Sequence, residues 1–307
     1  MKATSSDPVR SPIINGKEAV LTVTVVICSR NRPALLRECL RAVSRLDPRS
    51  DEVLVVDNSP GDKDTEDAAI EFGARYTIEA VTGLSRARNR GLAESNTDIV
   101  AYLDDDAIPE RDWLGVLLAP FEDESLAAST GRVVIPDSDH QLRISRTLSN
   151  ADPEWFEIAT FGGMGLGSNM AFRKNACPQP TFDVRLGRGA PFEIGEESYA
   201  LARLLSKNYR AVYQPTAIVF HPPLSRDTIE HEARNAIAYW LLLFMEFPEQ
   251  RTSLVRFLIR RLRHKPLNWV RDPQEPGEIV NSGWRVLLKA GFQALWLFLR
   301  TPKQKAR

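Results

Sequence analysis

The feature that most constrains the fold is Leu21–Cys28 (LTVTVVIC), an almost wholly apolar, β-branched run. Such a run is typical of a strand buried on both faces of a parallel sheet. A helix is predicted to follow from Pro33 to Leu46, because Pro suits a first helical position and apolar residues then recur at helical spacing. The alternation continues with predicted strands at 52–57, 75–78 and 99–103 and predicted helices at 63–73 and 84–93. This order predicts an open α/β sheet with right-handed crossovers.

Polar residues follow several of these predicted strands directly. They are Ser29 to Asn31, Asp57, and Asp104 to Asp106. Ligands in open α/β sheets bind at the carboxyl ends of the strands. We therefore expect the functional groups of this half to gather at one sheet edge.

The second half of the chain is less regular and then becomes helical. Strands are expected at 126–135 and at 211–220, the latter interrupted at Pro215, with a helix at 196–206 between them. Amphipathic patterns predict helices at 227–246, 250–264 and 283–300. We divide the chain into an N-terminal extension at 1–20, an α/β domain at 21–225 with halves 21–106 and 107–225, and a basic helical extension at 226–307.

Composition excludes several classes of protein. Hydrophobic residues make up 43% and charged residues 26%, which is a globular composition. Forty basic and forty acidic residues give a net charge of zero, so nucleic acid is not an expected partner. From Arg251 onward, however, the chain has 13 basic and 3 acidic residues. Three cysteines without paired spacing predict neither a disulfide framework nor a zinc site, and the uncharged stretches near the C-terminus are too short for a membrane span.

Asp104-Asp105-Asp106 ends the strand 99–103. Adjacent carboxylates repel one another, and Mg²⁺ or Mn²⁺ shared with phosphate oxygens would compensate their charge. A solvated acidic turn is the alternative.

Seven segments in order extend the argument beyond any single motif. They are Thr24 to Pro33 (TVVICSRNRP), Val55 to Asn58 (VVDN), Gly83 to Gly91 (GLSRARNRG), Ile99 to Asp106, Gly167 to Arg173 (GSNMAFR), Leu186 to Glu197, and Gln214 to His221 (QPTAIVFH). In order and spacing, residues 21–221 resemble the nucleotide-sugar-dependent glycosyltransferases of family 2.

The resemblance implies a GT-A fold and an inverting transfer from a nucleoside-diphosphate sugar. It assigns Ser29, Arg30 and Asp57 to the nucleoside. It assigns Asp106 to the metal and Asp104 to the metal or ribose, while Asp105 is the alternative inward-pointing carboxylate. His221 is a candidate third metal ligand or a structural strand-end residue.

Two further segments are assigned to the donor. In Gly83 to Gly91, helical spacing places Arg86 and Arg90 on one face and Arg88 elsewhere, so at most two of these arginines can serve one ligand. The resemblance assigns Arg86, which matches the family position near the nucleotide, to the donor together with Asn89. A solvated basic helix is the alternative. The glycine-rich loop before Asn169 would let the backbone approach the donor sugar, with Asn169 as a polar contact; packing alone is the alternative.

Direct displacement at an anomeric carbon also needs a group that takes the proton of the attacking hydroxyl. Glu196-Glu197 stands where the family usually has Glu-Asp, which assigns Glu197 as general base and Glu196 as the other candidate. Acidic residues complementing a helix dipole are the structural alternative.

The sequence therefore predicts a cytoplasmic, divalent-metal-dependent hexosyltransferase with a saccharide or glycolipid acceptor, acting in polysaccharide or glycolipid assembly. For the basic tail, peripheral contact with the inner face of a membrane and packing on its own domain both remain open. The alternatives for the whole protein are a nucleotidyltransferase and a catalytically inactive sugar- or membrane-binding scaffold. The donor base (UDP being one candidate), the sugar, the linkage and the oligomeric state are not determined by the sequence.

Overall fold

The computed structural model of the chain describes residues 13–14, 17–18, 21–61, 63–136, 144–223, 229–264 and 283–301. Its main sheet has the strand order β5-β4-β3-β6-β10-β8-β11-β7, and β9 pairs with β11. The strands of this sheet are β3 (Val23–Ser29), β4 (Glu52–Asp57), β5 (Arg75–Ile78), β6 (Ile99–Asp104), β7 (Ile108–Pro109), β8 (Leu126–Val134), β9 (Arg146–Leu148), β10 (Asn169–Arg173) and β11 (Arg210–Phe220). A separate hairpin pairs β1 (Ile13–Ile14) with β2 (Lys17–Glu18).

The first half of the sheet is parallel, as the sequence predicts. Strands β5, β4, β3 and β6 run in one direction, and β10 lies antiparallel between β6 and β8. Strand β11 runs parallel to β8, and its pairing register shifts between Gln214 and Ile218, around Pro215. The α/β GT-A class with a C-terminal helical extension is confirmed.

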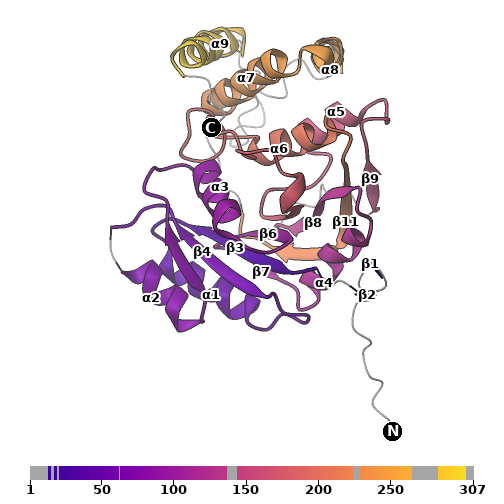
Figure 1. The fold of residues 1–307 in the computed structure, drawn as a ribbon. Helices are drawn as coiled ribbons and strands as arrows, with labels where there is room; N and C mark the ends of the chain where they lie inside the picture. The colour runs from indigo at the N-terminus through magenta and orange to yellow at the C-terminus, as the bar shows by residue number, and fades with distance from the viewer. Residues whose placement is uncertain are drawn as a thin grey trace.

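The helices cover both faces of the sheet (Figure 1). Their bounds are α1 (Pro33–Val43), α2 (Asp64–Glu71), α3 (Leu84–Glu94), α4 (Trp113–Leu118), α5 (Trp155–Thr160), α6 (Glu196–Leu205), α7 (Ile229–Glu246), α8 (Arg251–His264) and α9 (Gly283–Arg300), with short 3₁₀ turns at Ala119–Glu122, Lys174–Ala176 and Pro248–Gln250. In Figure 1, α7, α8 and α9 lie together beyond α5 and α6. Among the described residues, no helix combines the length and apolarity needed to cross a bilayer.

Strand β3 supplies side chains to two cores because successive residues face opposite sides of a sheet. Val25 and Ile27 belong to the core under α1, whereas Val26 belongs to the core under α3. Helix α3 lies close to β3 at Gly91, where a Cβ atom would approach Val26 Cγ1 to 2.4 Å. Any larger residue would push α3 outward, so Gly91 fixes the height of α3 above the strand ends.

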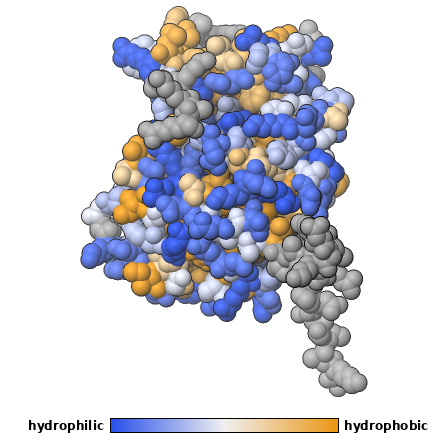
Figure 2. Space-filling model, viewed as in Figure 1, coloured by the Kyte–Doolittle hydropathy of each residue, from blue (hydrophilic) through white to orange (hydrophobic). Residues whose placement is uncertain are grey.

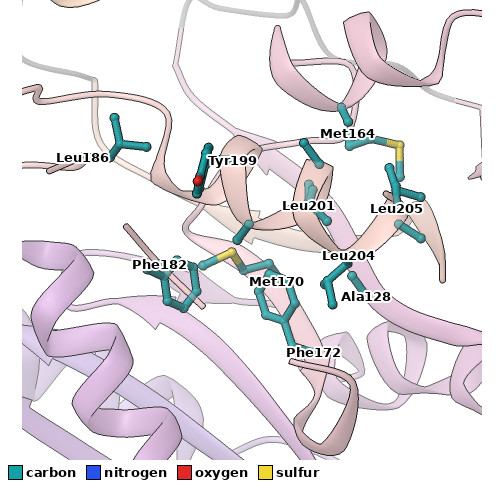
Figure 3. Close-up of a cluster of buried hydrophobic side chains, with 14 of the residues drawn as sticks. Ala128, Met164, Met170, Phe172, Phe182, Leu186, Tyr199, Leu201, Leu204 and Leu205 are labelled. Carbon is teal, nitrogen blue, oxygen red and sulfur yellow. The ribbon is translucent and has the colours of Figure 1, made fainter. Parts of the chain in front are cut away.

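Helix α6 is anchored on the second core. Its apolar residues Tyr199, Leu201, Leu204 and Leu205 pack with Met170 and Phe172 of β10 (Figure 3). The helix begins after Gly195, which has a φ of 82° and lies so close to the Tyr239 ring that a Cβ would approach it to 2.6 Å. Only glycine tolerates both conditions without strain. The first turn of α6, with Glu196 and Glu197, is thereby held in a fixed place.

Candidate active site

The strand register brings the polar strand ends together. Ser29 is paired with Asp57, and Cys28 with Asp104, across neighbouring parallel strands. Beside this edge lies a cavity of about 750 Å³. Its walls include Ser29, Arg30 and Arg32 at the end of β3 and just beyond it, Asn58 after β4, Leu84, Ala87 and Arg88 of α3, Asp104 and Asp106 at the end of β6 and just beyond it, the segments Leu166–Ser168 and Arg188–Gly189, the segment Glu193–Glu197, and His221.

Asp104, Asp106 and His221 form one cluster in the wall of this cavity. One ligand atom from each residue lies within 4.8 Å of the others. His221 Nε2 is 3.2 Å from Asp106 Oδ1 and 3.8 Å from Asp104 Oδ2. His221 Nδ1 lies 2.7 Å from the Pro222 carbonyl oxygen, so Nδ1 donates to it and Nε2 faces the carboxylates.

This donor set suits a divalent cation. Two carboxylates and an imidazole are ligands that Mn²⁺ accepts, and Mg²⁺ is bound through one or two carboxylates. Asp106 Oδ1 is buried, and the polar atom facing it is His221 Nε2 at 3.2 Å, which can itself act as a metal ligand. The residues present therefore fit the metal that the sequence predicts.

The charges of the cluster complement one another. Burial alone would raise the pKa of Asp106, but the hydrogen bond and charge of His221, with the charge of Arg32, lower it overall. Burial alone would lower the pKa of His221, yet its contacts with Asp106 and Pro222 raise it overall. A cation between the carboxylates would replace the imidazolium proton as the compensating charge.

Asp105 faces away from this cluster. Its side chain is fully buried and accepts a 2.7 Å hydrogen bond from Ser29 Oγ and two hydrogen bonds from the Arg32 guanidinium. Arg32 Nη1 also donates to Asp106 Oδ2 at 2.7 Å. Burial raises the pKa of Asp105 to about 6 despite the charge of Arg32. Asp105 thus ties the segment after β3 to the end of β6 rather than lining the cavity.

Arg88 connects the two acidic sides of the cavity. Its side chain is only 2% exposed and forms a 2.8 Å ion pair from Nη1 to Glu196 Oε1. Nη2 lies 3.3 Å from Asp104 Oδ1 and donates to the Gly167 carbonyl at 3.0 Å. A Cβ on Gly167 would come within 2.9 Å of this guanidinium, so the glycine makes room for Arg88.

Glu196 and Glu197 have different surroundings although they are adjacent. Glu196 is buried against Arg88, whereas Glu197 is half-buried in the cavity wall. Burial, and after it the negative charge of Glu196, raises the pKa of Glu197. The positive charge of Arg88 lowers this pKa by less, so the pKa of Glu197 lies above its ordinary value. A carboxyl with a raised pKa beside a cavity is suited to take a proton from a bound hydroxyl.

The sequence pattern of glycosyl transferase family 2 matches residues 24–182, about half of the chain. The chain belongs to glycosyl transferase family 2. It is 38% identical over 223 residues to the pre-mycofactocin glycosyltransferase of Mycobacterium tuberculosis, covering 69% of this chain and 45% of that protein. The chain thus spans less than half the length of that relative.

Solved structures agree with this family 2 fold. The mannosyltransferase PcManGT from Pyrobaculum calidifontis, in complex with GDP-Man and Mn²⁺, has a TM-score of 0.58 at 17% identity, covering 97% of this chain and 80% of that one. Staphylococcus aureus TarS 1–349, in complex with UDP-GlcNAc, has a TM-score of 0.61 at 12% identity, covering 91% and 82%. At these identities the likeness is one of fold.

Several residues that the sequence predicts to bind the donor or the metal line the cavity. Ser29, Arg30, Asp104, Asp106 and His221 all line it, as do Glu196 and Glu197. Arg30 is exposed and has no ion-pair partner among the residues that the structure describes. Its charge therefore remains available to an anionic ligand.

The other donor predictions lie outside the cavity wall. Asp57 accepts hydrogen bonds from Tyr76 Oη at 2.8 Å and from the Ser59 amide at 3.0 Å. Asn89 holds the loop at Phe182 through both its amide atoms, and Arg86 is half-buried elsewhere on α3. Asn169 is fully buried, where it accepts from Trp113 Nε1 at 2.8 Å and donates to the Ala217 carbonyl at 2.8 Å.

The sequence interpretation did not assign Arg32 or Arg88 to the site. The face of α3 that turns inward carries Arg88, not Arg86. A signal for this is present, because Leu84, Arg88 and Leu92 follow one another at four-residue spacing and share a helix face. Arg32 carries no comparable signal, since its role depends on the meeting of two loops.

Proposed function

We propose that this protein is an inverting glycosyltransferase that moves a sugar from a nucleoside-diphosphate sugar to a hydroxyl of a saccharide or glycolipid acceptor. The observation that carries the proposal is a single cavity with Asp104, Asp106 and His221 in one part of its wall and Glu197 in another. A departing diphosphate and an attacking hydroxyl need these two kinds of group on opposite sides of one anomeric carbon.

Asp104, Asp106 and His221 would hold Mn²⁺ or Mg²⁺. When bound, such a cation neutralises the negative charge that develops on the diphosphate leaving group. Arg30, exposed in the same wall, provides a further positive charge toward the donor. That PcManGT is solved with GDP-Man and Mn²⁺ supports a nucleotide-sugar donor and a divalent cation here.

Glu197 is the proposed general base. It takes the proton of the acceptor hydroxyl while the acceptor oxygen forms a bond to the anomeric carbon and the bond from that carbon to the diphosphate oxygen breaks. Attack opposite to the leaving group inverts the anomeric configuration. Glu196 is less suited to this step, because its carboxylate is buried in an ion pair with Arg88.

Arg88 and Arg32 would position rather than react. Arg88 fixes Asp104 relative to Glu196, and Arg32 fixes Asp106 relative to Asp105. Both ends of the cavity are therefore set before a ligand enters, which lowers the cost of organising the reacting groups.

A thermal-shift panel of UDP, GDP, dTDP and CMP, each with and without Mn²⁺, tests the donor. Binding to the native state raises its stability, so one nucleotide with Mn²⁺ should raise the Tm more than Mn²⁺ alone. Asp106→Asn should lose this increment. Asp112→Asn, a change at an exposed aspartate outside the cavity wall, should retain it.

Turnover then separates the enzyme from a binding scaffold. Metal-dependent release of the nucleoside diphosphate from the matching sugar donor supports the proposal. A nucleotide that binds with Mn²⁺ but never turns over, with water or with saccharide acceptors, would instead favour the scaffold. Release of pyrophosphate from a nucleoside triphosphate would favour a nucleotidyltransferase.

A further inference from the structure

Helix α9 uses one face to pack on the rest of the protein. Ala290 and Ala294 are fully buried on that face, and the Phe298 ring stacks on Phe192 with centroids 6.3 Å apart and an interplanar angle of 12°. Phe192 directly precedes Glu193, the first residue of the segment Glu193–Glu197 that lines the cavity. The inner face of α9 therefore rests on the loop that forms one wall of the proposed active site.

The opposite face of α9 is apolar although it is exposed. Phe292, Leu295, Trp296 and Leu299 follow at spacings of three and four residues, which places them on one stripe. Their side chains are 74%, 47%, 55% and 76% exposed. Figure 2 shows apolar residues at the surface over α9, next to strongly hydrophilic ones. A helix that packs on its own domain normally carries polar residues on this face, so the stripe indicates a docking surface.

Helices α8 and α9 are rich in basic residues. The sequences of α8 and α9 together contain eight Lys and Arg residues and neither Asp nor Glu. Arg300 lies over the Trp296 ring with its Cζ 4.1 Å from the centroid. On α8, exposed Arg256 directly follows exposed Val255, and exposed Ile259 lies one turn further along. Apolar residues between Lys and Arg, with no acidic residue, are typical of helices that lie in the interface of an anionic bilayer.

We propose that the outer face of α9 (Phe292, Leu295, Trp296 and Leu299), with the exposed residues Lys289 and Arg300 on either side of it in the sequence, docks on an anionic phospholipid surface. The aromatic and aliphatic side chains enter the headgroup region, and the basic side chains pair with lipid phosphates. A second copy of the chain is a poorer occupant, because joining two such faces would bring positive charges against positive charges.

Docking through α9 would place the proposed active site near the membrane surface, an inference that rests on the proposed function. A helix is about 10 Å across, so docking the outer face would hold the loop at Phe192 and Glu193 about one helix diameter from the lipid headgroups. A hydroxyl of a membrane-bound glycolipid would then be near the cavity, whereas the same catalytic groups would still act on a water-soluble acceptor.

Co-sedimentation of the full chain with vesicles tests the docking. The chain should bind vesicles of phosphatidylcholine mixed with phosphatidylglycerol, bind pure phosphatidylcholine much more weakly, and lose binding as salt is raised. The double variant Phe292→Ser with Trp296→Ser should bind at least about tenfold more weakly. Ile70→Ser, which changes a 64% exposed apolar side chain on α2, should bind as the unchanged chain does.

Two accompanying measurements keep the outcome decisive. The Tm of the double variant should match that of the unchanged chain, since both side chains are exposed. If the unchanged chain does not bind vesicles and the double variant has a clearly lower Tm, the protein itself covers the stripe. That result would overturn the proposal. Dimerisation that the double variant abolishes, again without vesicle binding, would overturn it in favour of a second copy. Transfer to a water-soluble acceptor should be equal in both proteins, which separates a failure of docking from a failure of the proposed function.

Discussion

Arg88 and Glu196 form a buried ion pair, with 2.8 Å between Nη1 and Oε1, although 108 positions separate them in the chain. The same guanidinium reaches Asp104, so one side chain joins the end of β6 to the first turn of α6. Both Glu196 and Glu197 line the cavity, but Arg88 is paired with Glu196. Glu197 is therefore the carboxyl whose charge is less compensated.

Replacing Arg88 should destabilise the protein and inactivate it. In Arg88→Ala, the Glu196 and Asp104 carboxylates lose their counter-charge inside the protein, which costs about 3–5 kcal/mol of unfolding free energy. Urea unfolding measures this loss. Arg90→Ala, on the same helix, removes an exposed pair with Glu94 and should cost no more than about 1 kcal/mol. Equal stabilities for the two variants would contradict the role given to Arg88.

Asp106→Asn should remove activation by the metal while the fold remains intact. Asp106 is a proposed ligand of the cation that neutralises the charge developing on the diphosphate. Its loss should lower kcat by about 10²–10³ and raise the Mn²⁺ concentration needed for half-maximal activity. Steady-state rates over a Mn²⁺ series measure both quantities, with Asp112→Asn as the matched control. An unchanged Mn²⁺ dependence in Asp106→Asn would mean that the cation lies elsewhere.

The pH dependence of kcat should report Glu197. The base acts in its deprotonated form, and burial with the charge of Glu196 raises its pKa, so the acidic limb should lie above the ordinary range for Glu. Glu197→Gln should lower kcat by about 10²–10⁴. Glu196→Gln should retain measurable transfer and move the limb toward lower pH, because it removes a negative charge beside Glu197. The reverse pattern, in which only Glu196→Gln loses transfer, would make Glu196 the base.

Asn169→Ala tests whether this residue contacts the donor or only supports the fold. The structure predicts a fall of about 2–4 kcal/mol in unfolding free energy, because Trp113 Nε1 and the Ala217 carbonyl lose a buried partner. The KM for the donor should stay the same. Asn150→Ala, at an exposed side chain, should change the stability by less than about 0.5 kcal/mol. A raised donor KM at unchanged stability would instead place Asn169 against the donor.

The regular part of the fold could be predicted from local pattern. The bounds predicted for β4 (Glu52–Asp57) and β5 (Arg75–Ile78) are those observed. Both strands are short and lie between polar or turn-forming residues, so the apolar pattern and the residues that interrupt it define their bounds. The parallel register then brings Asp57 and Asp104 to the same edge without further information.

Side-chain roles that depend on long-range contacts could not be predicted in this way. Helical spacing separates Arg86 from Arg88, but it does not say which of them faces the sheet. That choice is made by Gly91, which lets α3 approach Val26, and by Glu196, a partner far along the chain. Asp105 is a similar case. Only its hydrogen bonds with Ser29 and Arg32 show which of the three adjacent carboxylates is buried away from the cavity.

The most direct test of the account is the anomeric configuration of the first product. Proton NMR of freshly released sugar, formed by the protein with Mn²⁺ from whichever α-linked nucleotide sugar of the panel turns over, distinguishes the two anomers before they equilibrate. A single displacement with Glu197 as base on the side opposite to the diphosphate predicts the β anomer. Release of the α anomer would contradict the arrangement of metal and base across one cavity.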